Sequence, residues 1–528
     1  MPIALVARLE LAAQHHALDG TDRPPSERRL PVKNILLVLA SIVFSLIVAE
    51  AAVRYIDGYA MFALPLSEPV GSVTVRPELV DRVPLASGVE REWILSDPPA
   101  LPNRHAVPEE WKRLGRVVED NPTTSAEFRP PDLFKAWNSA FAGDPCKHSF
   151  LSHAPGRLFA YDPPDGNATP PYRYLPDVTL PSGLVTNQIG WRGTPIETPR
   201  GEKTVRIVFV GSSTVLDGPH LPFSWPEYVG HWLNLWAKSK RLPVRFEVLN
   251  AGRESIVSTD IAAVIRTEVL PLRPDLVVYY EGGNQFRPAS IVAKLPQGLT
   301  LPRAPADASP SWLQRVARDS AMMARVQAAV RTSASSLDGR EWPKPDYKVV
   351  WPAGLDEFDP DLSYPHLPVS LNVIQRDLDR IRADLDTTGS ELAVSSFMWM
   401  VKDGLVVDPL RHKYILEQLN IANYPFHYRE LERLAAFQNR LLAKYATVHG
   451  LAFLDIAGKM PFDPDLFIDA VHTNYAGGRI RGWVAFNQLL PTVEKHLADG
   501  SWPRPWPAGV PSGLPTFTSR RITFDCSR

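Results

Sequence analysis

The sequence Val205-Arg-Ile-Val-Phe-Val210, followed at once by Gly211-Ser-Ser-Thr214, contains the signal that decides the fold. Six residues rich in β-branched and aromatic side chains predict a fully buried strand, and the small residues after it predict an abrupt turn. A hydroxyl at the carboxyl end of a central strand lies where open α/β sheets bind their ligands. A lone Gly-x-Ser is more often only a structural turn, so the rest of the chain has to decide.

Two more strand patterns follow at helix-sized intervals, at Phe246–Asn250 and Leu276–Tyr280. Between them, Ser224-Trp-Pro-Glu227 is a typical helix start, with Ser as N-cap and Glu at the third position. A second helix pattern runs from about 259 to 269. Strands and helices that alternate over about 80 residues predict a parallel sheet with crossover helices.

This alternation of strand and helix patterns is interrupted at about 285–390. It then resumes with two more strand patterns, at 392–397 and 451–456, and a last helix ending near 498. Five parallel strands are therefore expected within a domain at 203–498. An insertion after a loop at the carboxyl edge is where a lid or substrate-shaping cap would lie. A decorative surface insertion remains the alternative.

Prolines are about twice as frequent as usual, with 52 in 528 residues. They gather at 61–200 and in the tail at 499–528, which predicts irregular segments wrapping around the domain. The formal net charge of -1 leaves no basic surplus for nucleic-acid binding.

An apolar segment near the N-terminus predicts a membrane helix at 34–54, after a polar segment at 1–33. A helix from Ile35 to Val53 would span about 28 Å, close to the thickness of a bilayer core. The basic residues before it favour an N-terminus inside and a body outside: Arg28, Arg29 and Lys33. A cleaved signal peptide is the alternative, because Ala49-Glu-Ala51 resembles a cleavage site, although the leader is long for one.

The two cysteines, Cys146 and Cys526, both lie beyond this helix. An oxidising compartment would permit a disulfide between them, joining the proline-rich region to the C-terminal tail. Two free buried thiols are the other interpretation.

Reactive or hydrogen-bonding residues follow several strand ends in order. In these residues the sequence resembles the SGNH, or GDSL-like, hydrolase family. Each block is weak alone, but all four occur in the right order on the expected elements. The resemblance covers roughly 203–290 and 390–495, a little over a third of the chain. The matching blocks within it are Gly211-Ser-Ser-Thr214, Ala251-Gly252, Gly282-Gly-Asn284 and Asp469-Ala-Val-His472.

The resemblance implies a flavodoxin-like three-layer α/β/α sandwich and a Ser-His-Asp triad that uses no metal or cofactor. Ser213 would be the nucleophile, His472 its base and Asp469 the group that orients the base. On a helical turn, residues three apart share a face, as Asp469 and His472 would. The N–H groups of Ser213 and Gly252 and the side chain of Asn284 would stabilise the oxyanion.

Departures from the family pattern are Ser212, where the family more often has Asp or Gly, and Gln285, where many members have Asp. The nucleophile elbow of α/β-hydrolases, Gly-x-Ser-x-Gly, is excluded because Val215 stands at its last position. Three polar residues near the first block are expected at the surface: Asp217, His220 and His231.

The leading hypothesis is a single-pass, membrane-anchored esterase that faces outward and hydrolyses an O-acyl ester. An envelope glycan or lipid would be a reachable substrate, because the anchor confines the enzyme near both. Two alternatives stay open: acyl transfer to or deacetylation of an envelope glycan at the same site, and a non-catalytic glycan-binding or assembly protein on the same scaffold.

Overall fold

The structure, a computed structural model, describes most of the chain but not its N-terminal segment or long parts of the proline-rich region and the insert. The described residues are 32–57, 59, 61–62, 75–107, 109, 112, 160–162, 169–170, 173–180, 182–219, 221–286, 292–293, 320–323, 325–326, 348–402, 405, 412, 415, 418–419, 428–506, 513–515 and 520–521. Cys146 and Cys526 lie outside them, so the disulfide stays a prediction.

The central sheet has five strands, all parallel, in the order β4-β3-β5-β8-β9. The predicted parallel five-stranded sheet is therefore confirmed. The last two strands end two residues earlier than predicted. The strands are β3 (Thr204–Gly211), β4 (Arg245–Asn250), β5 (Leu276–Tyr280), β8 (Glu391–Ser395) and β9 (Ala452–Leu454).

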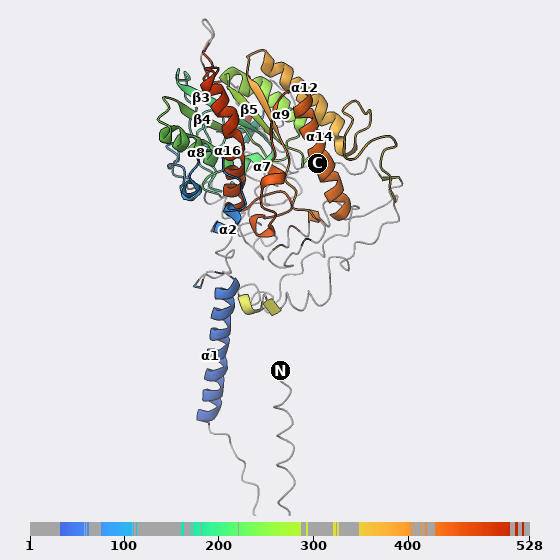
Figure 1. Ribbon diagram of the computed structural model, residues 1–528. Helices are drawn as coiled ribbons and strands as arrows, with labels where there is room; N and C mark the ends of the chain where they lie inside the picture. Colours follow the sequence, from blue (N-terminus) through green and yellow to red (C-terminus); the bar gives the residue numbers. More distant parts are fainter. Residues whose placement is uncertain are drawn as a thin grey trace, which may run out of the picture. The chain divides into compact units, whose positions relative to one another are not determined.

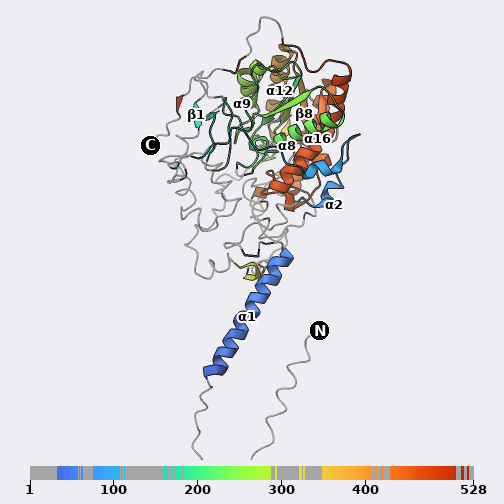
Figure 2. The same cartoon turned by 90° about the vertical axis from the view of Figure 1, so that its left-hand side faces the viewer.

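Helices cover both faces of this sheet and make three layers (Figures 1 and 2). On one face, α8 (Trp225–Ser239) packs on β4 and on α16 (Tyr475–Ala498). On the other, α12 (Leu371–Asp386) packs on α9 (Ser258–Val264) and on β8, and α14 (Tyr428–Val448) packs on β8 and β9. The α/β/α sandwich expected from the sequence is the observed fold.

Short elements complete the described chain. Before the sheet, the 3-10 helix η2 (Arg91–Leu95) lies against α8 and α16. The remaining ones are α2 (Pro77–Val80), β1 (Ala160–Asp162), β2 (Arg173–Tyr174), α7 (Ser213–Leu216), η5 (Leu270–Leu272), β6 (Val292–Ala293), β7 (Lys348–Val349), η7 (Pro368–Ser370), α15 (Ile456–Lys459), η9 (Pro464–Leu466) and β10 (Arg520–Arg521).

Local sequence explains where helices begin and change. Ser224 caps α8 in a complete capping box, since Glu227 Oε2 accepts the Ser224 N–H at 2.6 Å. The helix predicted at 259–269 is α-helical only to Val264 and continues as a π turn, η4 (Ile265–Val269). In this wider turn Glu268 is fully buried and accepts the Trp191 Nε1–H at 2.7 Å, a tertiary contact that periodicity does not reveal.

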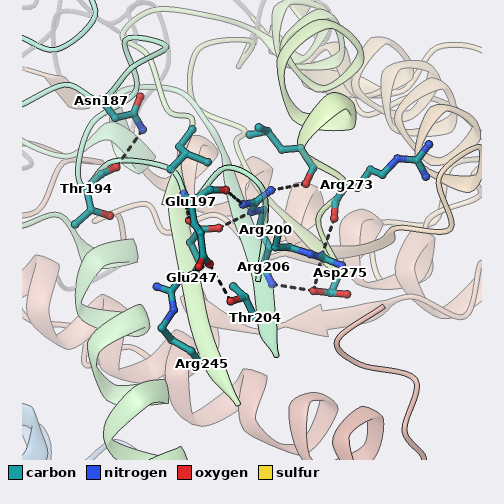
Figure 3. Close-up of polar contacts among 12 residues, drawn as sticks. Asn187, Thr194, Glu197, Arg200, Thr204, Arg206, Arg245, Glu247, Arg273 and Asp275 are labelled. Atoms are coloured by element: carbon teal, nitrogen blue, oxygen red, sulfur yellow. Dashed lines mark hydrogen bonds and ion pairs between the residues drawn. The ribbon is translucent and has the colours of Figure 1, made fainter. Parts of the chain in front are cut away.

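At the amino edge of the sheet, buried charges join three strands (Figure 3). Arg206 of β3 donates from Nε to Glu247 of β4 at 2.5 Å. Asp275, just before β5, accepts the Arg206 N–H at 2.8 Å and the Arg504 N–H at 2.7 Å. Each carboxylate is therefore paired, and the second contact fastens the C-terminal tail to the sheet.

Helix α1 (Val32–Asp57) belongs for most of its length to a separate unit, Met1–Ala52. Asn34–Ile56, 23 residues, is long and apolar enough to cross a membrane, and its most apolar part is not buried within the protein. The hydroxyls of Ser41 and Ser45 donate to carbonyl oxygens one turn earlier, both at 2.8 Å. Polar groups satisfied in this way fit an apolar surrounding, as a membrane anchor or a signal sequence requires.

Gly211 closes β3 where no side chain fits, because an added Cβ would lie 2.2 Å from the Tyr280 carbonyl oxygen and 2.4 Å from Val215 Cγ2. We expect Gly211→Ala to lower the free energy of unfolding by about 1–3 kcal/mol, the usual cost of overpacking. Gly513→Ala is the matched control, since a Cβ there meets nothing within 4 Å. It should change stability by less than about 0.5 kcal/mol. Denaturant unfolding in detergent measures both, and equal stabilities would contradict the prediction.

Candidate active site

Ser213 lies at the carboxyl end of β3, in the first turn of the four-residue helix α7. The strand ends at Gly211 and the helix begins two residues later, so the serine stands at the edge of the sheet. Its side chain is largely buried, with 6% of the residue exposed. The first N–H groups of a helix have no partner within it, and the Ser213 N–H is one of these.

His472 contacts Ser213 although it lies near the C-terminal end of the domain in the sequence. The Ser213 Oγ and His472 Nε2 atoms are 2.7 Å apart, although 259 positions separate the residues. His472 stands just before α16, in a segment closed by a bridge between Phe467 and Thr473 and by an Ile468 N–H to His472 carbonyl bond of 2.8 Å. The structure thus brings together the serine and the histidine singled out in the sequence.

Asp469 lies behind the imidazole. Its Oδ2 and Oδ1 atoms are 2.8 and 3.0 Å from His472 Nδ1. Oδ1 also accepts the backbone N–H groups of Val471 and His472, at 2.9 and 2.8 Å. The expectation that a helical turn pairs Asp469 with His472 is wrong, because both lie outside any helix, and the bridged loop makes them adjacent instead.

The electrostatics of this pair keep the carboxylate charged. Burial alone would raise the pKa of Asp469, but the charge of His472 and the hydrogen bonds from Val471 and His472 outweigh burial, so the pKa lies below its usual value. When the Nε2 atom of His472 carries no proton, the charged Asp469 still accepts the Nδ1–H. The Nε2 atom is then left as an acceptor facing the Ser213 hydroxyl.

The two other expected oxyanion donors differ in what they offer. The Gly252 N–H already donates to Asn250 Oδ1 at 2.9 Å. Glycine is needed there because a Cβ would lie 2.3 Å from the Leu216 N atom. Asn284 is exposed and donates one Nδ2–H to the Ile256 carbonyl at 2.8 Å, so its amide has a second N–H to give.

Glu281 is a residue that the sequence analysis missed. It directly follows β5, is fully buried, and accepts the Asn284 N–H at 2.9 Å. Burial raises its pKa, against hydrogen bonds from Ser212, Asn284 and Gly282 that lower it. Glu281 therefore connects the loop beside Ser213 with the loop of Asn284. An acidic residue right after a fully apolar strand, in Tyr279-Tyr-Glu-Gly-Gly-Asn284, was the available signal.

The expectation of a surface position is wrong for Asp217. Its side chain is buried and accepts the Trp225 and Gly218 N–H groups at 3.1 and 3.3 Å. Burial raises its pKa, opposed by the charges of Arg481 and Arg192. His231 is partly buried and lies 2.9 Å from the Ser96 hydroxyl, while His220 lies outside the described residues.

In the part of the chain that the structure describes, no three His, Cys, Asp or Glu side chains are grouped so that they could hold a metal ion. No protein-family model matches the chain, and the search of curated proteins finds no match.

Several solved structures resemble it over about half its length. An alpha/beta hydrolase enzyme, LAE5, from the metagenome of Lake Arreo has a TM-score of 0.29 and 14% identity over 55% of this chain and 99% of its own. An Axe2 variant, an acetyl xylan esterase from Geobacillus stearothermophilus, has a TM-score of 0.29 and 13% identity over 54% of this chain and 94% of its own. A protein assigned to the lipolytic G-D-S-L family, from Desulfitobacterium hafniense, has a TM-score of 0.27 and 11% identity over 54% of this chain and 99% of its own. At such scores the likeness carries no argument about activity.

The opposite pKa shifts of Glu281 and Asp469 predict opposite pH dependences of stability. Glu281 binds its proton more tightly when folded, so its contribution is lost as pH rises above 4.5. Asp469 binds its proton less tightly, so its contribution is lost as pH falls below 3.8. Relative to wild type, Glu281→Gln should therefore gain unfolding free energy as pH rises, and Asp469→Asn as pH falls, each by at most about 1.4 kcal/mol per pH unit. Urea unfolding across pH 2–8 tests this, and curves parallel to wild type above pH 4.5 for Glu281→Gln, or below pH 3.8 for Asp469→Asn, would contradict it.

Proposed function

We propose that the chain is a membrane-anchored serine esterase of the SGNH type that acts outside the cytoplasm. The observation that supports the proposal most is the continuous line of hydrogen bonds from the Ser213 hydroxyl to His472 Nε2 at 2.7 Å, and from His472 Nδ1 to Asp469 at 2.8 Å. A hydroxyl, an imidazole and a carboxylate in this order form the arrangement that activates a serine for acyl transfer.

In the proposed reaction, Ser213 Oγ attacks the ester carbonyl carbon while His472 Nε2 takes the hydroxyl proton. The oxyanion that forms is stabilised by the Ser213 N–H and by the second Nδ2–H of Asn284. The bond to the alcohol then breaks, and His472 protonates the leaving oxygen. Water, activated by the same histidine, attacks the acyl-enzyme, which releases the acid and restores Ser213.

An O-acyl group on an envelope glycan or lipid is the proposed substrate class. The reason is location, since an enzyme anchored by Asn34–Ile56 would meet both kinds of molecule at the membrane surface. The loop of Gly282–Asn284 lies against the aromatic ring of Phe397, as an added Cβ on Gly283 would lie 2.9 Å from Phe397 Cζ. An apolar ring therefore packs beside the loop that carries Asn284.

Removing either reacting group should abolish esterase activity. We expect Ser213→Ala and His472→Ala each to lower kcat by about 10⁴-fold or more. Asp469→Asn should also lower kcat, but by a smaller factor. Short acyl esters serve as substrates, and a fluorophosphonate probe should label wild type but not Ser213→Ala. Ser212→Ala is the control for the neighbouring hydroxyl and should keep its labelling. Undiminished turnover in Ser213→Ala or His472→Ala would refute the mechanism.

The anchored topology makes a separate prediction. Alkaline phosphatase fused after residue 528 should be active in cells, and a fluorescent protein that folds only in the cytoplasm should stay dark at the same position. The chain should keep its first 33 residues, which N-terminal sequencing of membrane fractions checks. An active cytoplasmic reporter would refute the orientation, and a new N-terminus near Glu50 would favour a cleaved signal peptide.

A further inference from the structure

One buried arginine connects the two segments that supply Ser213 and His472. Arg481, in the second turn of α16, is completely buried. Its Nη1 donates to the Thr214 carbonyl and its Nη2 to the Val471 carbonyl, both at 3.1 Å. Thr214 directly follows Ser213 and Val471 directly precedes His472, so a single guanidinium holds the backbone on both sides of the Ser213–His472 hydrogen bond.

Both segments gain from an external support. Helix α7 has only four residues, and His472 lies in the loop between η9 and α16. The Ser213–His472 contact joins points 259 positions apart. A guanidinium is planar and presents its N–H groups in a fixed fork, so two carbonyls bonded to one such group keep a set separation.

The charge of Arg481 is compensated by its surroundings. The guanidinium carbon lies 5.3 Å from the centre of the Tyr280 ring, which gives a cation–π contact beneath the carboxyl edge of the sheet. The carboxylate of Asp217, itself buried, interacts with the charge of Arg481. Burying a charge is costly, and a hydrophobic side chain would fill the core of α16 without that cost. The arrangement is therefore better explained by what the two carbonyl contacts hold.

We infer that Arg481 is a positioning residue for the proposed reaction, one that sets the distance between Ser213 Oγ and His472 Nε2 by clamping Thr214 and Val471. This inference rests on the proposed function. Displacements of about 1 Å between reacting groups cost on the order of 100-fold in rate. Lysine has a single ammonium on a flexible stem, which cannot reproduce the planar fork toward both carbonyls.

Arg479 is a matched control on the same helix. It is also buried, and it donates to the Ile94 carbonyl at 2.6 Å and to the Tyr228 hydroxyl at 3.0 Å, with an ion pair to Asp97. Its contacts beyond α16 reach α8 and the segment before the sheet rather than Thr214 or Val471. Replacing it removes a comparable buried guanidinium without touching the clamp.

The test uses the full chain in detergent, with Arg481→Lys and Arg479→Lys compared for Tm, kcat, KM and the rate of fluorophosphonate labelling. For Arg481→Lys we expect kcat and labelling rate to fall together by about 100-fold while KM changes less than about 3-fold. Arg479→Lys should lower Tm about as much as Arg481→Lys does, and it should keep kcat within about 3-fold of the wild-type value. If Arg481→Lys does not fold, Arg481→Gln, which also removes the buried charge, should show the same split between kcat and KM.

Four results would overturn the inference. Unchanged kcat in a folded Arg481 variant would leave the proposed function standing and remove the clamp alone. Equal losses in the Arg481 and Arg479 variants, or failure of both Arg481 variants to fold, would assign Arg481 to the fold. A wild-type protein that neither labels nor cleaves esters would overturn the proposed function, and the inference with it.

Discussion

Strand β3 is hydrogen-bonded to β4 on one side and to β5 on the other, with Phe209 opposite Asn250 and Gly211 opposite Tyr280. Parallel strands in this register end at the same edge, so the loops beginning at Ser212, Ala251 and Glu281 must meet there. A shift of one residue would turn each side chain to the other face of the sheet. The proposed chemistry depends on this register, because it brings the loop that carries Ser213 and the loop that carries Asn284 to the same edge of the sheet.

Buried charges gather at both edges of the sheet, but they serve different ends. At the amino edge, Arg206 bonds Glu247, and Asp275 accepts from β3 and from the C-terminal tail, so the contacts fasten chain segments to the strands. At the carboxyl edge, Glu281 and Arg481 instead contact residues next to Ser213, His472 and Asn284. Since burying a charge is costly, such groups are expected to be retained where they fix a geometry.

The sequence was sufficient for the five strands of the sheet and for singling out Ser213, His472 and Asp469, which the structure brings together. Runs such as Leu276–Tyr280 are unambiguous because leucine, β-branched and aromatic residues fill every position of a doubly covered strand. The sequence was insufficient for contacts with backbone groups, which every residue has. Arg481 bonds two backbone carbonyls, which leave no mark in the sequence, and Asp217 is buried by segments distant from it. Gly252 was expected as an oxyanion donor, but its N–H is bonded to Asn250, and the closeness of Leu216 is what requires a glycine there.

The 259 positions between Ser213 and His472 have a consequence for how the protein would be made. A ribosome releases the hydroxyl long before the imidazole, and α16, which carries Arg481, emerges later still. During synthesis the growing chain would possess a nucleophile without its base. Under the proposed function, the enzyme therefore stays inert throughout export, and cleavage of envelope esters begins only after the final helix has folded onto the sheet.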